Sequence, residues 1–172
     1  VYAHILKNEG KSYQEVIDYL EANKHRVHMM GPIDDLIFVA RRGRITMGKA
    51  IMGSFAGIKP MGDCNTDGYV SVLGKVKGIS KALDTTVAYV RQMATDIQDQ
   101  YLLISHSNRG VYAEKLRELA EDLGAKKVFV SDVFSGCGTN IGPGMVAIYF
   151  LGNDISDELT AEKAVMTTIL NG

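Results

Sequence analysis

Hydrophobic and polar residues alternate along the chain with two different periods, which indicates both helices and strands. Apolar positions spaced by three and four residues run through Leu83, Val87, Val90 and Met93 and predict a long helix that Ser80 can cap. Further helices are expected near residues 1–6, 12–22, 34–39, 111–123 and 157–170. Short apolar runs predict strands at residues 27–33, 57–61, 69–76, 101–104, 128–133 and 145–151.

A capping box fixes the start of one of these helices. Ser12 and Glu15 stand three residues apart, so each side chain can bind the backbone amide of the other residue. The helical spacing of Val16, Tyr19 and Leu20 predicts that these three residues form its core face.

The order of the elements predicts the fold class. A β-hairpin is expected where Asn65-Thr66-Asp67-Gly68 joins two apolar runs. The region from 101 to 133 has a strand, helix and strand in sequence, with Gly124 ending the helix. A hairpin together with such units implies an α/β fold with a mixed sheet covered by helices, rather than an all-parallel doubly wound sheet.

Composition and charge narrow the function classes. Of 172 residues 46% are hydrophobic and 23% charged, and no apolar stretch reaches the ~18–20 residues that cross a bilayer. Nineteen basic residues nearly balance twenty acidic ones, which argues against charge-driven binding of nucleic acid. Cys64 and Cys137 fit neither a paired metal motif nor a disulfide framework. We therefore expect a cytoplasmic protein without a metal or cofactor.

A glycine-rich segment is the first candidate for a binding site. Four glycines fall between residues 136 and 144, and we expect a loop between two strands there. Glycines let a backbone approach a ligand closely, so their amides could cradle a carboxylate or a phosphate. The alternative is a tight inter-strand connection whose shape is fixed by Pro143.

The sequence offers one cluster with a catalytic appearance. His106 stands between Ser105 and Ser107 at the end of an expected strand. A serine next to a histidine does not make a triad, and no Gly-x-Ser-x-Gly elbow is present. We therefore expect no enzymatic activity from this cluster.

Four stretches together make the chain resemble the DegV family. They are Asp34-Asp35-Leu36 leading to Arg41-Arg42-Gly43-Arg44-Ile45, then Ile58-Lys59-Pro60, then Gly68 through Lys75-Val76-Lys77-Gly78 to Lys81-Ala82, and Asn140-Ile141-Gly142-Pro143-Gly144. Their order matches the family, and the resemblance runs to Gly152. It implies a two-layer domain with a mixed sheet of about six strands, like the second domain of DegV proteins and of dihydroxyacetone kinase. Residues 1–33 would be the junction with a missing amino-terminal domain, and residues 34–172 the lipid-binding domain.

The resemblance also implies a function and a set of site residues. Such a protein binds a long-chain fatty acid such as palmitate or stearate and presents its carboxylate to a fatty acid kinase. The residues implied for the carboxylate are Asn140, Thr139, Arg44, Gly142 and Gly144. Asn140 stands where the family commonly has a histidine, so its contact should not respond to pH near 6–7.

Two further groups of residues follow from this interpretation. Residues that could line an acyl tunnel, or simply form core, are Phe38, Ile51, Met52, Phe55, Met61, Met145, Ile148 and Phe150. Basic residues that could face the kinase or make transient contact with a membrane surface, or simply be solvated, are Arg41, Arg42, Lys75, Lys77 and Lys81.

Two other functions remain open at this point. The chain could be a substrate-binding subunit related to dihydroxyacetone kinase, in which His106 would have to hold the substrate. It could also be a protein-interaction domain whose apolar face docks a missing half of the molecule.

Overall fold

A single mixed sheet organises the molecule. The computed structural model describes residues 1–32, 35–43 and 57–172. Within these residues the sheet has six strands in the order β3-β2-β1-β6-β4-β5. Their bounds are β1 (Val27–Pro32), β2 (Ile58–Cys64), β3 (Val70–Lys77), β4 (Tyr101–His106), β5 (Lys127–Asp132) and β6 (Val146–Leu151). The strands β4 and β5 run parallel and the other neighbours run antiparallel, which confirms the expected mixed sheet.

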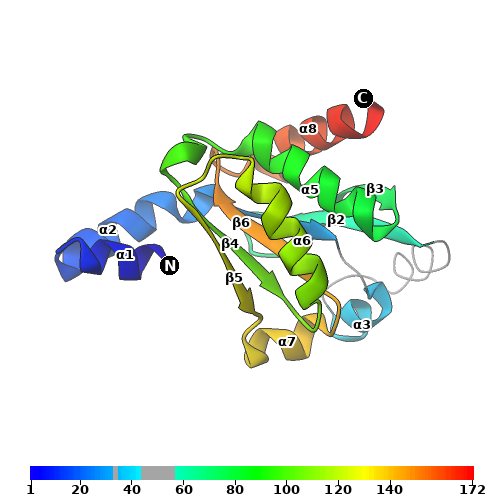
Figure 1. The fold of residues 1–172 in the computed structure, drawn as a ribbon, viewed down its shortest axis with the longest axis horizontal. Coiled ribbons are helices and arrows are strands. Elements are labelled where there is room, and N and C mark those ends of the chain that lie inside the picture. The colour runs from blue at the N-terminus through cyan, green and yellow to red at the C-terminus, as the bar shows by residue number, and fades with distance from the viewer. Residues whose placement is uncertain (33–34, 44–56) are drawn as a thin grey trace.

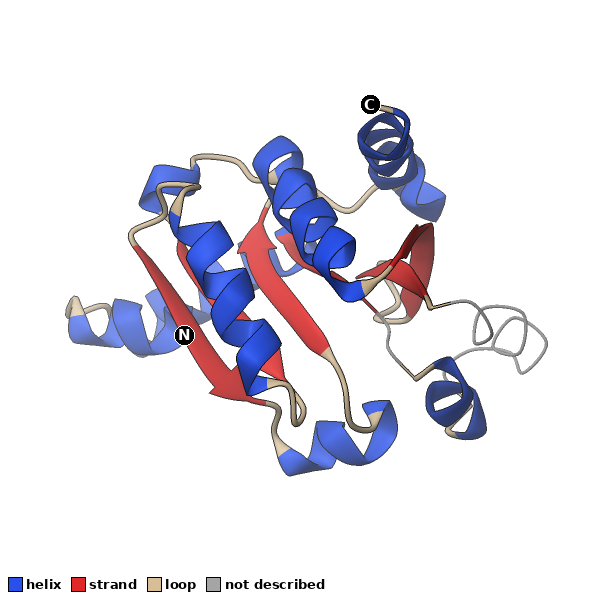
Figure 2. Cartoon of the chain, turned by 45° about the vertical axis from the view of Figure 1, so that its right-hand side comes forward, coloured by secondary structure: helices blue, strands red, loops and turns tan. Residues whose placement is uncertain are grey.

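Helices cover one face of this sheet. The helices are α1 (Tyr2–Asn8), α2 (Tyr13–Asn23), α3 (Leu36–Arg41), α5 (Ile79–Met93), α6 (Gly110–Glu121), α7 (Ser135–Ile141) and α8 (Thr160–Asn171), with short 3₁₀ turns at Lys24–Arg26, Ile97–Asp99 and Asp157–Leu159. Figure 1 and Figure 2 show α5 and α6 side by side across the same face of the sheet. The helices α3 and α7 contact each other at one end of the sheet (Figure 1).

The core lies between the sheet and its covering helices. Successive side chains of a strand point to opposite faces, so alternate residues of each strand enter this layer. Met30 on β1, Ile104 on β4 and Ile148 on β6 are fully buried there, against Leu83 of α5 and Leu116 of α6. The predicted apolar spacing of α5 is thereby confirmed.

The two leading helices do not join this core. The capping box of α2 is confirmed, because Ser12 and Glu15 each bind the other's backbone amide. The expected core face of this helix is wrong: all of α2 is described and none of its residues is buried, with Leu20 41% exposed. Tyr19 packs instead on Tyr2 of α1, with ring centroids 5.9 Å apart.

Two local expectations from the sequence need correction. The segment from 136 to 144 is not simply a loop, because α7 occupies most of it before Gly142 turns the chain at a φ of +75°. Ser80 does not cap α5, because this helix already begins at Ile79, with Gly78 before it at a φ of +82°. A positive φ is accessible to glycine, so the chain enters the helix one residue earlier than the serine suggested. The hydroxyl of Ser80 accepts a hydrogen bond from Lys115 of α6.

Candidate functional site

An apolar cavity lies on the sheet face opposite the core helices. Its volume is about 550 Å³, within the range typical of sites for small ligands. The described residues that line it come from β1, β2, β3, β6 and α7, from the turn before β3, from the start of α3 and from the segment between α7 and β6: Met29, Gly31, Pro32, Asp35, Gly62, Cys64, Gly68, Tyr69, Val70, Cys137, Asn140, Ile141, Pro143, Met145, Ala147 and Tyr149.

Alternate residues of two neighbouring strands form the floor of the cavity. Met29 and Gly31 come from β1, while Met145, Ala147 and Tyr149 lie along β6 and just before it. At ~3.3 Å per residue, the four steps from Met145 to Tyr149 span about 13 Å. The floor is therefore a trough, with α7 at one end and the β2–β3 turn at the other.

Gly31 allows the two floor strands to approach closely. A Cβ atom on this residue would lie 2.2 Å from the carbonyl oxygen of Val146 and 2.8 Å from the Cα of Ala147. Both neighbours are backbone atoms, which cannot rotate away. A larger residue at this position would push β1 from β6, so the shape of the floor depends on this glycine.

Of the residues predicted to bind the carboxylate, only Asn140 is among the described residues that line the cavity. Asn140 lines the cavity at its α7 end, and its side-chain amide donates to the carbonyl of Gly136 over 3.1 Å. Thr139 is exposed, donates to the same carbonyl and is outside the described lining. The amide of Gly142 donates to Gly138, and that of Gly144 donates to Ser107. These two amides therefore have acceptors within the chain, and Arg44 lies outside the described residues.

The predicted tunnel residues divide into four groups. Met145 lines the cavity. Met61, Ile148 and Phe150 lie in the core beneath the helices and are not among the described residues of the cavity wall. The ring of Phe38 covers Gly142, where an added Cβ would meet it at 2.6 Å, so that this residue joins α3 to α7. Ile51, Met52 and Phe55 lie outside the described residues.

Residues that the sequence analysis did not select make up much of the lining. These residues include Met29, Cys64, Val70, Ala147 and Tyr149, and the last two alternate along β6 with residues that point into the core. Both sets are apolar, so composition alone does not separate them. The alternation within β6 could have suggested two apolar faces, but not which of them is covered by helices.

The predicted basic residues are all exposed and none is among the described residues that line the cavity. Arg41 and Arg42 end α3, Lys75 and Lys77 lie on β3, and Lys81 lies on α5. The guanidinium of Arg42 lies over the ring of Phe38, 5.4 Å from its centroid. These five basic side chains therefore lie on the solvated surface, at the end of α3, on β3 and on α5.

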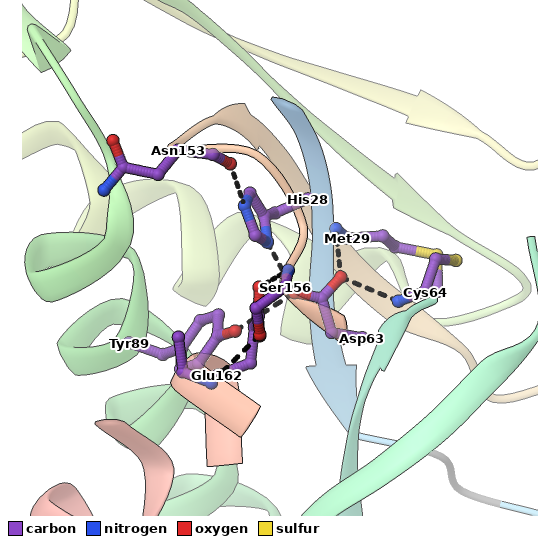
Figure 3. Close-up of polar contacts among 9 residues, drawn as sticks. His28, Met29, Asp63, Cys64, Tyr89, Asn153, Ser156 and Glu162 are labelled. Carbon is purple, nitrogen blue, oxygen red and sulfur yellow. Dashed lines mark hydrogen bonds and ion pairs between the residues drawn. The ribbon is translucent and has the colours of Figure 1, made fainter. Parts of the chain in front are cut away.

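A buried polar network lies directly behind the cavity wall (Figure 3). The Oδ1 atom of Asp63 accepts from the backbone amides of Met29, at 2.8 Å, and Cys64, at 2.7 Å. Its Oδ2 atom accepts from Nδ1 of His28 at 2.8 Å and from the hydroxyl of Tyr89 at 3.1 Å. His28, Asp63 and Tyr89 are fully buried. Four donors therefore converge on one carboxylate.

His28 is held as a cation by its two partners. Its Nε2 atom lies 3.0 Å from the carbonyl oxygen of Asn153, and its Nδ1 faces the carboxylate of Asp63. Neither acceptor can donate a proton, so both ring nitrogens donate. Burial lowers the pKa of His28, but the hydrogen bond and charge of Asp63, the carbonyl of Asn153 and the charge of Glu162 together outweigh it. The pKa of His28 is therefore raised.

A second buried carboxylate lies close to this pair. Glu162 of α8 is fully buried, and it accepts from the amide of Ser156 at 3.0 Å and from the hydroxyl of the same residue. Burial, followed by the charge of Asp63, raises the pKa of Tyr89. This tyrosine therefore stays a neutral donor to Asp63 while two negative charges share its surroundings.

The thiol of Cys64 and the phenol of Tyr149, both on the cavity wall, are neutral at physiological pH. Burial, followed by the charge of Asp63, raises the pKa of Cys64 to about 11. Burial is also the main cause that raises the pKa of Tyr149 to about 12. The wall between β2 and β6 therefore carries no charge from these side chains, as an apolar ligand requires.

The histidine at the end of β4 does not take part in the cavity. His106 lies 3.5 Å from the carboxylate of Asp132, and its Nδ1 accepts from the amide of Arg109. It is not among the described residues that line the cavity. In the part of the chain that the structure describes, no group of three or more His, Cys, Asp or Glu residues could hold a metal ion.

The fold and this site define a class of α/β domain, one that carries an apolar cavity on the sheet face opposite its helices. The chain belongs to the DegV family, because the protein-family model described as "Uncharacterised protein, DegV family" matches residues 1–153 of its sequence. It is 31% identical over 153 residues to the DegV domain-containing protein CPE0026 of Clostridium perfringens, a match that covers 88% of this chain and 53% of that protein. The chain thus spans about half the length of this relative.

Solved structures share the fold at low sequence identity. A DegV family protein from Eubacterium eligens, loaded with heptadecanoic acid, matches with a TM-score of 0.76 at 20% identity, over 88% of this chain and 54% of that one. The fatty acid kinase (Fak) B3 protein of Streptococcus pneumoniae, loaded with linoleic acid, matches with a TM-score of 0.75 at 14% identity, over 88% and 53%. The expected two-layer DegV fold is confirmed. Among the described helices, none is long and apolar enough to span a membrane.

Proposed function

We propose that this chain binds a long-chain fatty acid, such as palmitate or stearate, in the cavity on the open side of the sheet. The acyl tail would follow the floor from Met145 towards Met29 and Tyr149, and the carboxylate would lie at the α7 end beside Asn140. The observation that carries this proposal is the cavity itself, a largely apolar trough whose described lining includes the amide side chain of Asn140. Fatty acids in the related structures of the family support it.

The acyl tail would supply most of the affinity. At ~0.8 kcal/mol per buried CH₂, a tail of about fourteen methylenes gains roughly 11 kcal/mol gross before association costs. A single hydrogen bond from Asn140 contributes far less. The head-group contact would therefore set the orientation of the ligand and leave its carboxylate accessible.

We further propose that the protein is a cytoplasmic carrier rather than an enzyme, and that it presents the carboxylate to a separate fatty acid kinase. The relation to a fatty acid kinase B protein supports this role. Arg41 and Arg42, exposed beside α7, together with Arg44, would face the kinase or an anionic membrane surface. An additional amino-terminal domain, preceding residues 34–172, would close the head-group end.

Native mass spectrometry of the intact natural protein tests the carrier function. We expect a retained mass that matches a C16–C18 fatty acid, and its disappearance after delipidation. Adding palmitate should restore that mass with a stoichiometry of one, because the proposed site, formed by the described residues, is one trough. An intact protein that neither retains nor takes up a fatty acid would contradict the proposal.

Substitution of Asn140 tests the position of the carboxylate. Asn140→Ala should weaken palmitate binding by about 1.5 kcal/mol, roughly tenfold, because one hydrogen bond to a charged group is lost. Asn140→His should bind more tightly below about pH 6.5, where the imidazole becomes cationic. Titration with a fluorescent fatty acid would measure both effects.

Thr139→Ala is the matched control for this experiment. This neighbour is also polar, but its hydroxyl is exposed and is bonded to the carbonyl of Gly136. We expect its affinity to equal that of the wild type. Equal losses in the Thr139 and Asn140 variants would place the carboxylate elsewhere.

A further inference from the structure

We propose that the side chain of Asp63 is a wedge between β1 and β2 that holds the inner end of the cavity open. The expected effect of Asp63 on acyl-chain preference rests on the proposed function. The separation of β1 and β2 by this side chain does not depend on any ligand. Figure 3 shows Asp63 between the backbones of Met29 and Cys64.

The pairing of β1 with β2 stops where the wedge begins. Gly31 pairs with Gly62, and Pro32 pairs with Met61. Continuing this antiparallel register by two residues beyond Gly31 and Gly62 would place Met29 opposite Cys64, in a pair that exchanges two backbone hydrogen bonds. The described ladder contains no such pair.

The carboxylate of Asp63 takes the place of that missing pair. One oxygen atom, Oδ1, accepts from the amides of both Met29 and Cys64. Two donors on facing strands are thus satisfied by one side-chain atom between them. The β2–β3 ladder is irregular between Met61 and Gly62, where β3 carries the extra residue Leu73, so a bend from this bulge would fall on β3.

The separation of the strands has a direct effect on the cavity. Met29 and Cys64, whose amides bind the wedge, both line the end of the cavity farthest from Asn140. Direct pairing of the two backbones would bring these side chains together and narrow the trough. Asp63 therefore determines how far a tail extends past Ala147.

His28 makes the wedge possible without taking part in it. A buried carboxylate without a counter-ion would be strongly disfavoured, and His28 supplies that positive charge on the side of Asp63 away from the cavity. The groups that face His28 are Asp63 from β2, Tyr89 from α5, Phe150 from β6, the carbonyl of Asn153 and Glu162 from α8. The imidazolium thus lies among three acceptor groups and two aromatic side chains.

Two substitutions distinguish the effect of a side chain between the two strands from the effect of its negative charge. Asp63→Asn keeps an oxygen that accepts from both amides, and its NH₂ group can donate to a neutral His28. Asp63→Ala removes the wedge. We expect Asp63→Asn to keep the wild-type preference among acyl chains, and Asp63→Ala to shift it towards shorter chains.

The measured quantity is the ratio of laurate to palmitate affinity in the intact natural protein. One buried methylene corresponds to about fourfold in affinity, so loss of two gives a shift of at least tenfold. Simple destabilisation lowers the active fraction for both ligands and leaves their ratio unchanged. If Asp63→Ala does not fold, His28→Leu combined with Asp63→Leu also removes the wedge without leaving a buried charge.

A crystal structure of the Asp63→Ala variant tests the separation of β1 and β2 without any ligand. We expect Met29 and Cys64 to pair directly, with Cα atoms about 5.5 Å apart. The wild-type separation in that variant, or an unchanged laurate to palmitate ratio, would overturn the wedge. A wild-type protein that binds no fatty acid would overturn the proposed function alone, since the strand separation would still be measured.

Discussion

Replacement of His28 by alanine lowers the free energy of unfolding by about 3–5 kcal/mol, the range expected when one partner of a buried ion pair is removed. The variant leaves the carboxylate of Asp63 buried with two backbone amides and the hydroxyl of Tyr89 as its remaining partners. It also removes a ring that stacks on Phe150, with centroids 5.2 Å apart. Urea-induced unfolding near pH 6 would measure the loss.

His25→Ala is the matched control for this prediction. This histidine lies three residues earlier and its side chain is exposed. Exposed substitutions usually change stability by less than about 0.5 kcal/mol. A similar small change in His28→Ala would show that the buried pair contributes little to folding.

The same pair predicts a specific dependence of stability on pH. The pKa of His28 is raised in the folded protein above its value in the unfolded chain. Its stabilising contribution is therefore fully present below the unfolded pKa of about 6.5 and is lost as the pH rises through the folded pKa. We expect this decline in the wild type and in His25→Ala, but not in His28→Ala. Unfolding curves between pH 6 and 9 would reveal it.

Ala147→Phe should remove most of the affinity for a fatty acid. Ala147 lies on the cavity floor between Met145 and Tyr149, and its side chain faces Gly31. A phenyl ring there would occupy the path of the tail. Exclusion of about four methylenes costs roughly 3 kcal/mol, which is more than a hundredfold in affinity. Displacement of a fluorescent fatty acid by palmitate would measure this effect.

Ser131→Phe controls for the added ring. Ser131 pairs with Ser105, which in turn pairs with Ala147, so all three side chains share one face of the sheet. Ser131 is exposed on β5 and is not among the described residues that line the cavity. We expect wild-type affinity from this variant. Undiminished binding by a folded Ala147→Phe variant would place the acyl chain outside the trough.

The sequence alone determined the fold class and much of the local structure. The capping box at Ser12, the hairpin turn at Asn65 to Gly68 and the apolar spacing of α5 depend on neighbours within a few residues. Such short-range interactions are encoded directly in the pattern of side chains. The four motifs in their fixed order also indicated the DegV family. That resemblance implied the mixed sheet and a fatty acid as ligand.

Tertiary structure alone decided which residues form the cavity. Met145 and Ile148 were both expected to line a tunnel, yet the first lies on the cavity floor and the second in the core. Residues on opposite faces of a buried strand can be equally apolar, so their roles depend on which face the helices cover. The strand expected at residues 57–61 also extends to Cys64. The polar residue within that extension, Asp63, is buried only because His28, 35 residues earlier, is brought beside it by the pairing of β1 and β2.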